Sequence, residues 1–214
     1  MIYVKIIIWG AGELGKSVYH ILKQTGSHIE GFIDDYKTGE FLGLPILGTR
    51  DYLSEVLPEQ YVLAIAIGYN HFCARQEAFE LCKRKEFELV NAIHPTAVID
   101  KSVQIGEGTV CFAGVIIDHH VQVGNNVLVN TGSVISHDTT IGDYSFIGPG
   151  VRIAGDVVIG KRVFIGIGST IIEYLNIGDD ALIGGGTIVI RNVPTGDKQV
   201  GVPAKSIAGK GVLT

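Results

Sequence analysis

A repeat of six residues governs the second half of this 214-residue chain. Every sixth position from residue 93 to residue 189 is Ile or Val, with a single Cys as the exception. These positions are Ile93, Ile99, Ile105, Cys111, Ile117, Val123, Val129, Ile135, Ile141, Ile147, Ile153, Ile159, Ile165, Ile171, Ile177, Ile183 and Val189. The fourth residue after each is small or modest, for example Val103, Thr109, Ser133, Thr139, Ser145, Val151, Ser169 and Thr187. This period predicts a triangular parallel β-helix, in which three hexads close one coil and residues 18 apart stack at about 4.8 Å.

Glycine supports the same interpretation. The chain has 29 glycines, about twice the usual share. Many follow the aliphatic residue directly, as Gly106, Gly124, Gly142, Gly148, Gly160, Gly166, Gly178 and Gly184 do. We expect these glycines to permit turn conformations that other residues resist.

The first half alternates between strand and helix patterns. Apolar, β-branched runs predict strands, and residues at helical spacing predict helices between them. The expected strands are Val4–Trp9, Ile29–Ile33, Tyr61–Ile67 and Glu88–Ala92, and the expected helices are Lys16–Gln24 and Arg75–Lys85. This order implies a parallel sheet with right-handed crossovers. We therefore expect a Rossmann-like α/β domain over residues 1–92 and an all-β domain with a C-terminal tail over residues 93–214.

A glycine-rich loop follows the first strand. Gly10-Ala11-Gly12-Glu13-Leu14-Gly15 has the spacing G-x-G-x-x-G, and Asp34-Asp35 lies about 20 residues further on, where an acidic residue contacts a ribose hydroxyl in dinucleotide-binding folds. A redox enzyme that uses NAD is one interpretation, although about 90 residues are too few for a full dinucleotide fold and a catalytic domain. Glycines that serve only a tight turn are another.

Composition excludes several classes. The net charge of −5 gives no nucleic-acid footprint. The apolar run Ile6–Trp9 is too short to span a membrane. Cys73, Cys82 and Cys111 fit no zinc spacing and are expected to be free thiols. These features predict a cytoplasmic protein without a membrane or nucleic-acid partner.

One corner of the predicted β-helix carries residues suited to acyl transfer. His119, His137 and Gly155 are 18 residues apart and should stack on successive coils, with Asp138 beside His137. His137 lies at an outward position and titrates near neutrality, which suits a general base. Asp138 is expected to hold the imidazole, and the Gly155 N–H to donate to the oxyanion. A groove for the pantetheine arm is expected to run past Ile167 and Gly185.

The sequence around His137 resembles a known family. Val129-Asn130-Thr131-Gly132-Ser133-Val134-Ile135-Ser136-His137-Asp138, followed by Ile141-Gly142, is similar to the active-site coil of the hexapeptide-repeat sugar O- and N-acyltransferases of sialic-acid and bacillosamine biosynthesis. The resemblance extends from Gly10 to Lys205. It implies left-handed coils, a homotrimer, acetyl-CoA as acyl donor without a metal, and the roles of base for His137 and supporting acid for Asp138.

The resemblance also implies the ligand contacts. The C-terminal segment Gly201-Val202-Pro203-Ala204-Lys205 looks like the stretch that approaches coenzyme A, which assigns Pro203 and Lys205 to cofactor binding. The positions matching the family's nucleotide-sugar contacts are Gly12, Glu13, Leu14, Asp34, Asp35 and Gly68. The implied reaction is N-acetylation of a UDP-, dTDP- or GDP-linked 4-amino-4,6-dideoxy sugar for bacterial glycan or O-antigen assembly.

Two positions depart from the family pattern. Family members commonly carry a second His nine residues after the first, in contact with the acetyl group or coenzyme A, and this chain has Phe146 there. An apolar acyl pocket, or a bulkier acyl group, follows as an interpretation. Members also often have Gly-His where this chain has Glu13-Leu14, which leaves the sugar and the base open.

Three other functions remain as alternatives. A hydroxyl acceptor would use the same base, so O-acetylation is the nearest one. Hexapeptide β-helices also build γ-type carbonic anhydrases, in which His119, His120 and His137 would converge on zinc. A non-catalytic scaffold that binds nucleotide sugars is the third.

Overall fold

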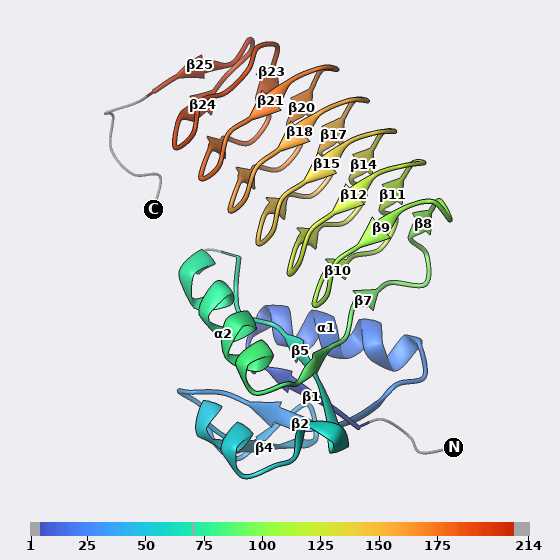
Figure 1. Cartoon of the computed structure of the whole chain (residues 1–214), viewed down its shortest axis with the longest axis vertical. Helices are drawn as coiled ribbons and strands as arrows, with labels where there is room; N and C mark the ends of the chain where they lie inside the picture. Colours follow the sequence, from blue (N-terminus) through green and yellow to red (C-terminus); the bar gives the residue numbers. More distant parts are fainter. Residues whose placement is uncertain (1–4, 70, 208–214) are drawn as a thin grey trace. The chain divides into compact units, whose positions relative to one another are not determined.

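The structure, a computed structural model, describes residues 5–69 and 71–207. It divides into two compact units (Figure 1). The first unit ends at Pro95 and also includes Glu107–Val110, and the second unit comprises Thr96–Gly106 and continues from Cys111. The domain boundary between residues 92 and 93 stays a prediction.

The first unit is an α/β sheet with a helix packed against each half. Its elements are β1 (Lys5–Trp9), α1 (Glu13–Gln24), β2 (His28–Ile33), β3 (Glu40–Phe41), β4 (Leu44–Gly48), two 3₁₀ helices (Arg50–Ser54 and Pro58–Gln60), β5 (Tyr61–Ile65), α2 (Phe72–Arg84), β6 (Glu88–Leu89) and β7 (Ala92–Ile93). The sheet has the order β3-β4-β2-β1-β5-β6 and is parallel except for the β3–β4 pair. The helix α1 contacts β1 and β2, and α2 contacts β5 and β6.

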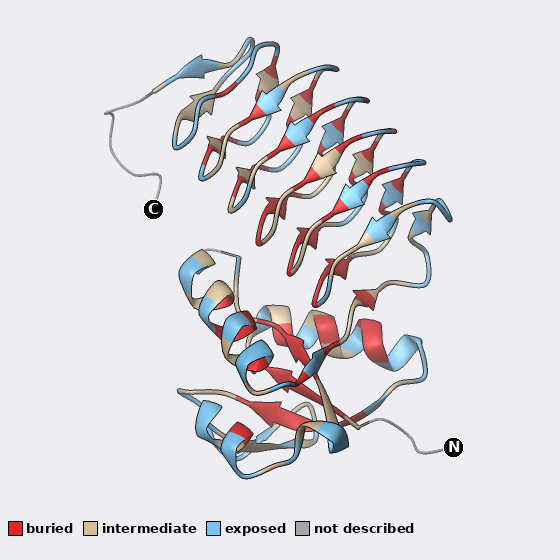
Figure 2. Ribbon diagram, viewed as in Figure 1, coloured by how far each residue is buried: buried red, intermediate tan, exposed pale blue. Residues whose placement is uncertain are grey.

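The strand order places a binding crevice beside β1. The chain runs from β1 to β2 on one side and later returns to β5 on the other side of β1. Open parallel sheets bind ligands at such a switch point, beyond the carboxyl ends of the strands. Ile7 and Ile8 of β1 have no exposed surface, so the strand is anchored in the core (Figure 2).

The hairpin of β3 and β4 lies in a region for which the sequence predicts no element. Its turn residues Leu42 and Gly43 have φ of 53° and 75°. Two successive residues with positive φ are typical of a type I′ turn, whose usual sequence signals are Asn-Gly and Asp-Gly. Leu-Gly carries no such signal, which is why the hairpin escapes prediction.

The second unit is a parallel β-helix built from strands of two residues. The strands are β8 (Val98–Ile99), β9 (Gln104–Ile105), β10 (Val110–Cys111), β11 (Ile116–Ile117), β12 (Gln122–Val123), β13 (Leu128–Val129), β14 (Val134–Ile135), β15 (Thr140–Ile141), β16 (Phe146–Ile147), β17 (Arg152–Ile153), β18 (Val158–Ile159), β19 (Phe164–Ile165), β20 (Thr170–Ile171), β21 (Asn176–Ile177), β22 (Leu182–Ile183) and β23 (Ile188–Val189). The aliphatic residue of each hexad is the second residue of its strand, as the repeat predicts.

Three sheets form the three faces of this prism (Figure 1). We call them the β14 face (β8-β11-β14-β17-β20-β23), the β15 face (β9-β12-β15-β18-β21) and the β16 face (β10-β13-β16-β19-β22). Partners in each face are 18 residues apart, for example Ile117 with Ile135 and Ile135 with Ile153. Figure 2 shows the buried residues repeating from coil to coil.

Small hydroxyl residues complete the interior. The Ser133 hydroxyl donates to the Gly148 carbonyl at 2.8 Å, and the Ser169 hydroxyl donates to the Gly184 carbonyl at 2.9 Å. Buried hydroxyl groups need such partners, because an unpaired one costs free energy. The fourth position after each aliphatic residue therefore points inward, as predicted.

The repeat stops after Val189. Leu182 pairs with Lys198, 16 residues later, so the last coil is two residues shorter than the others. The chain then forms β24 (Lys198–Val200) and the antiparallel β25 (Lys205–Ser206).

The expected role of the glycines after the aliphatic residues is wrong. The left-handed conformation recurs every six residues at other corner positions, among them Gly114, His120, Gly132 and Asp138. The glycine at 142 is needed for a different reason, because a Cβ there would lie 2.5 Å from the Gly160 carbonyl carbon of the next coil. These glycines allow close stacking of coils rather than a special φ.

Candidate active site

The corner between the β14 and β15 faces presents His137 and Asp138. The His137 Nδ1 lies 3.0 Å from the Asp138 Oδ2, and both side chains are 45% exposed. His137 thus points out of the prism, as predicted. Because the carboxylate can only accept, the geometry assigns the proton to Nδ1 and leaves the lone pair on Nε2. A neutral imidazole in this tautomer can take a proton from a substrate.

The turn conformation directs the carboxylate of Asp138. This residue has a φ of 56°, a conformation that Asp adopts more readily than most residues. The hydrogen bond with His137 is the largest influence on the carboxyl group and lowers the pKa of Asp138 below its ordinary value, and the nearby His120 acts in the same direction. Asp138 therefore remains a negative partner for an imidazolium on His137.

The ring of His137 lies between two neighbours of its own column. His119 stacks on it, with ring centroids 5.4 Å apart and planes 12° apart. On the other side, a Cβ on Gly155 would lie 2.5 Å from the His137 Cε1, so the ring rests directly on this glycine. The predicted column of His119, His137 and Gly155 is thus present. Gly155 is buried, and its proposed role as oxyanion donor stays a prediction.

A second histidine contacts the same carboxylate. The His120 Nδ1 lies 3.5 Å from the Asp138 Oδ1. Among the residues that the structure describes, His119, His120 and Asp138 are the group whose possible metal-ligand atoms lie within 4.8 Å of one another. His137 is not a member of this group, which differs from the three-histidine zinc site of the carbonic-anhydrase alternative.

The predicted cofactor residues lie elsewhere on the prism. Ile167 is 64% exposed, and a Cβ on Gly185 would lie 3.1 Å from its Cγ2, so these two residues stack at the corner between the β16 and β14 faces. Phe146 belongs to the β16 face, is 5% exposed and stacks on Phe164 with ring centroids 5.0 Å apart. Within one chain the structure does not bring these residues to His137.

The C-terminal segment is exposed. Pro203 and Lys205 are both exposed, and Lys205 pairs with Val200 in the β24–β25 hairpin. Their predicted contact with coenzyme A stays a prediction.

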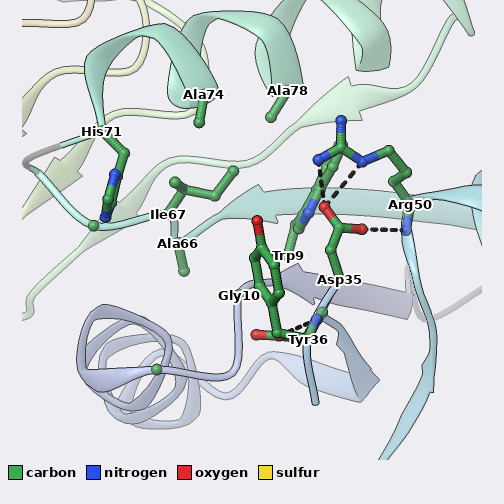
Figure 3. Close-up of a pocket in the computed structure, with 13 residues that line it drawn as sticks. Trp9, Gly10, Asp35, Tyr36, Arg50, Ala66, Ile67, His71, Ala74 and Ala78 are labelled. Carbon is green, nitrogen blue, oxygen red and sulfur yellow. Dashed lines mark hydrogen bonds and ion pairs between the residues drawn. The ribbon is translucent and has the colours of Figure 1, made fainter. Parts of the chain in front are cut away.

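The first unit contains a separate pocket at its switch point (Figure 3). The cavity has a volume of about 260 Å³. Its lining comes from the ends of β1, β2 and β5 and from the start of α2, and comprises Trp9, Gly10, Gly12, Asp34, Asp35, Tyr36, Arg50, Ala66, Ile67, Gly68, His71, Ala74 and Ala78. Two helix N-termini, Gly12 for α1 and His71 for α2, reach this pocket without a side-chain cap. Uncapped helix N-termini attract anions such as a diphosphate.

Three glycines of the loop have distinct roles. A Cβ on Gly10 would lie 2.5 Å from the Ala66 carbonyl oxygen, and one on Gly15 would lie 2.0 Å from the Gly10 carbonyl oxygen. These two are needed for packing. A Cβ on Gly12 would meet no atom within 4 Å. The fold does not require this glycine, so Gly12 leaves open space at the N-terminus of α1, where a ligand can approach the backbone.

The two aspartates shape the pocket. The Asp34 Oδ2 accepts from the Ala11 N–H at 2.8 Å, and its Oδ1 accepts from the N–H groups of Tyr36 and Lys37. Asp34 thus ties the glycine loop to the loop after β2. Its remaining lone pairs can still accept from a ligand.

Asp35 is paired with a residue that the sequence analysis missed. The Arg50 N–H donates to the Asp35 Oδ1 at 2.9 Å, and the guanidinium contacts Oδ2 (Figure 3). Burial works to raise the pKa of Asp35, but the bonds from Arg50 outweigh it and lower the pKa. The Arg50 guanidinium also lies 5.8 Å from the Trp9 ring centroid. Arg50 begins a 3₁₀ helix after the unpredicted hairpin, which is why no motif indicated it.

Gly68 lines the pocket as predicted, and Glu13 and Leu14 are not among the lining residues. The sequence analysis also missed Tyr36, which is 95% exposed, and His71. Both follow strands whose carboxyl ends meet at the switch point, and this position was the available signal. In the described part of the chain, neither helix has the length and apolar character to cross a bilayer.

Comparisons with known proteins support both units. The family described as PglD N-terminal domain matches residues 5–80, and the bacterial transferase hexapeptide family, with six repeats, matches residues 120–155. A comparison with curated proteins gives no match.

Solved structures cover almost the whole chain. A histidine-to-alanine variant of GDP-perosamine N-acetyltransferase from Caulobacter crescentus, in complex with CoA and GDP-perosamine, is 35% identical, covers 97% of both chains and has a TM-score of 0.91. The acetyltransferase domain of PglB from Neisseria gonorrhoeae, in complex with acetyl coenzyme A, is 30% identical, covers 95% of this chain and 98% of its own, and has a TM-score of 0.91. WeeI from Acinetobacter baumannii is 25% identical, covers 95% and 100%, and has a TM-score of 0.73.

A Rossmann-like unit with an anion-receptive pocket and a β-helix with an exposed His–Asp pair together define a hexapeptide-repeat acyltransferase. The chain belongs to the sugar N-acetyltransferases of the PglD type. The predicted fold class, including the left-handed β-helix, and the predicted resemblance are confirmed. The NAD-enzyme, carbonic-anhydrase and scaffold alternatives are disfavoured, because both units match this transferase family.

Proposed function

We propose that this protein transfers the acetyl group of acetyl-CoA to the amine of a nucleotide-linked 4-amino-4,6-dideoxy sugar. The observation that carries the proposal is the 3.0 Å contact between His137 Nδ1 and Asp138 Oδ2 on an exposed corner of the β-helix. GDP-perosamine, which a relative with 35% identity binds, is the first sugar to test, and its UDP- and dTDP-linked counterparts follow.

The chain's own residues divide the chemistry. The amine nitrogen forms a bond to the acetyl carbonyl carbon, and His137 Nε2 takes the proton that this nitrogen loses. Asp138 stabilises the imidazolium. The Gly155 N–H donates to the oxyanion on the former carbonyl oxygen. The carbon–sulfur bond then breaks, an amide forms, and the coenzyme A thiolate leaves and recovers the proton.

The pocket of the first unit holds the nucleotide. The N-termini of α1 and α2 attract the diphosphate, which approaches the open backbone at Gly12 and Gly68. Asp34 and Asp35 face the same cavity and accept hydrogen bonds from ribose or base. Glu13 and Leu14 are assigned to substrate binding by the resemblance alone.

A homotrimer unites the acyl site. His137 lies at one corner of the prism, and Ile167 and Gly185 lie at another, so a cleft that uses both draws them from two copies. The β14 face supports this arrangement with an exposed apolar row, in which Val98 is 64% exposed and its strand partner Ile116 is 44% exposed. Light scattering during gel filtration should give three times the chain mass of 22.9 kDa. A monomer would contradict the shared site.

Pro203, Lys205 and Phe146 are proposed to contact the coenzyme in that trimer. A cytoplasmic location suits the activity, because Cys73, Cys82 and Cys111 are free cysteines, as is typical of a reducing compartment.

The decisive experiment compares His137→Ala with the wild type. We expect kcat with acetyl-CoA and GDP-perosamine to fall by about 100-fold or more, because the general base is lost, while circular dichroism and the unfolding temperature stay unchanged. Lys101→Ala is the matched control, because Lys101 is exposed and lies two coils before His137 in the same column. A loss below about tenfold in His137→Ala would remove His137 as the base.

A further inference from the structure

The two histidines of the preceding coil are not used by the mechanism above. His119 and His120 occupy the coil before His137 and Asp138, and each contacts one member of that pair. We infer that His119 and His120 are positioning residues, which hold the ring of His137 and the carboxylate of Asp138 in the geometry for proton transfer. This inference rests on the proposed role of His137 as general base.

The first contact fixes the plane of the His137 ring. With His119 on one face at a centroid distance of 5.4 Å and Gly155 against the other, the ring is held between two neighbours. His137 is half exposed, so solvent alone would leave its ring free to rotate. Stacking by His119 removes part of that freedom and keeps Nδ1 beside Asp138.

The second contact fixes the carboxylate. Asp138 has one oxygen 3.0 Å from His137 Nδ1 and the other 3.5 Å from His120 Nδ1. A carboxylate held at both oxygens cannot rotate away from His137 without losing a partner.

His120 is itself held by hydrogen bonds from the coil before it. Its N–H donates to the Ser102 hydroxyl oxygen at 2.9 Å, and that hydroxyl donates to the Asp100 Oδ1 at 2.6 Å. A continuous set of contacts therefore leads from Asp100 to His137 across three coils. The side chain of His120 is placed before substrate arrives, as a positioning role requires.

The backbone permits clean substitutions at position 120. His120 has a φ of 58°, and glycine occupies the equivalent corner at Gly114 and Gly132. His120→Gly removes the imidazole without straining the turn, and His120→Asn keeps an N–H donor near the place of Nδ1 in a residue that tolerates this φ. At position 119, His119→Ala removes the ring and His119→Phe keeps a stacking surface.

The experiment measures kcat and the two KM values for these four variants, with EDTA present to keep metal from the cluster of His119, His120 and Asp138. We expect His119→Ala and His120→Gly to lower kcat by about three- to tenfold and to change both KM values by less than about twofold, because only the orientation of the base is affected. His119→Phe and His120→Asn should recover to within about twofold of the wild-type kcat.

Two outcomes would overturn the inference. One is a wild-type kcat in His119→Ala and His120→Gly. The other is a loss in which His119→Phe and His120→Asn are no better than the removals, although their unfolding temperatures match the wild type. Failure of the proposed function is separate, because an active His137→Ala enzyme would remove the base itself, whatever the four variants do.

Discussion

In the β-helix the side chains around His137 come from positions 18 residues apart, whereas the pocket of the α/β unit collects residues from three strand ends and two helix starts. The two sites are therefore held in different ways. Each β-helix residue is supported by the coils on either side, and its neighbours are the same kind of position in the next hexad. In the pocket, single charged contacts such as Asp34 with the Ala11 N–H join loops that are distant in sequence.

This difference predicts that backbone spacing dominates stability in the β-helix. In Gly142→Ala the new Cβ would lie 2.5 Å from the Gly160 carbonyl carbon and 2.8 Å from the Lys161 nitrogen. Neither atom can move without separating two coils, so we expect the free energy of unfolding to fall by about 3 kcal/mol. Urea denaturation followed by circular dichroism measures this change.

Gly12→Ala is the matched control in the α/β unit. Its Cβ would meet nothing within 4 Å, so the change in the free energy of unfolding should stay below about 0.5 kcal/mol. Equal losses in the two variants would show that the stacking distance is not what the β-helix glycines protect.

The same contrast explains what the sequence predicts. A period of six makes the neighbour of every β-helix residue calculable, so the column of His119, His137 and Gly155 follows from the sequence alone. The contact between His120 and Asp138 does not, because it depends on the left-handed φ of both residues. No pattern of residue types marked those corners.

The pocket was less predictable for a different reason. The glycine loop and the aspartates are local motifs, and the sequence indicates them. Arg50 reaches Asp35 only because the β3–β4 hairpin returns the chain, and a Leu-Gly turn carries no hairpin signal. The placement of Ile167 and Phe146 away from His137 also requires the three faces of the prism, which a single motif does not convey.

A second glycine substitution sharpens the comparison, because it should affect activity rather than stability. In Gly155→Ala the new Cβ would lie 2.5 Å from the His137 Cε1, which is the end of a rotatable side chain and not backbone. The ring can swing outward at little cost to the fold and then loses its place beside Asp138. We expect kcat to fall about tenfold, since small misplacements of a catalytic group have effects of this size or larger. The unfolding temperature should stay near that of the wild type.

Steady-state kinetics and thermal unfolding on one preparation test this prediction. A Gly155→Ala enzyme with wild-type kcat would mean that the position of the ring over Gly155 does not matter for proton transfer. A large loss of unfolding temperature would instead place Gly155 with Gly142 among the stacking glycines.

The smallest expected effect concerns the pocket and depends on pH. Arg50 holds the pKa of Asp35 below its ordinary value of 3.8, against the opposing effect of burial. The carboxylate therefore stabilises the folded state fully above about pH 4, and this stabilisation is lost as the pH falls through the lowered pKa. Asp35→Asn should reduce the free energy of unfolding by about 1 kcal/mol at pH 7, and the difference from the wild type should shrink below about pH 4.

Asp180→Asn offers the contrasting case in the β-helix. Asp180 also pairs with an arginine, Arg162 at 2.7 Å, but its side chain is 49% exposed, whereas that of Asp35 is 19% exposed. Solvent screens the exposed pair, and the neighbouring coils already fix both residues, so we expect no measurable change at any pH. Urea denaturation of both variants at pH 7 and pH 3 decides between the two. A pH-dependent loss in Asp180→Asn that equals that of Asp35→Asn would mean that charge pairs contribute alike in both units, and that the contrast between them lies only in backbone packing.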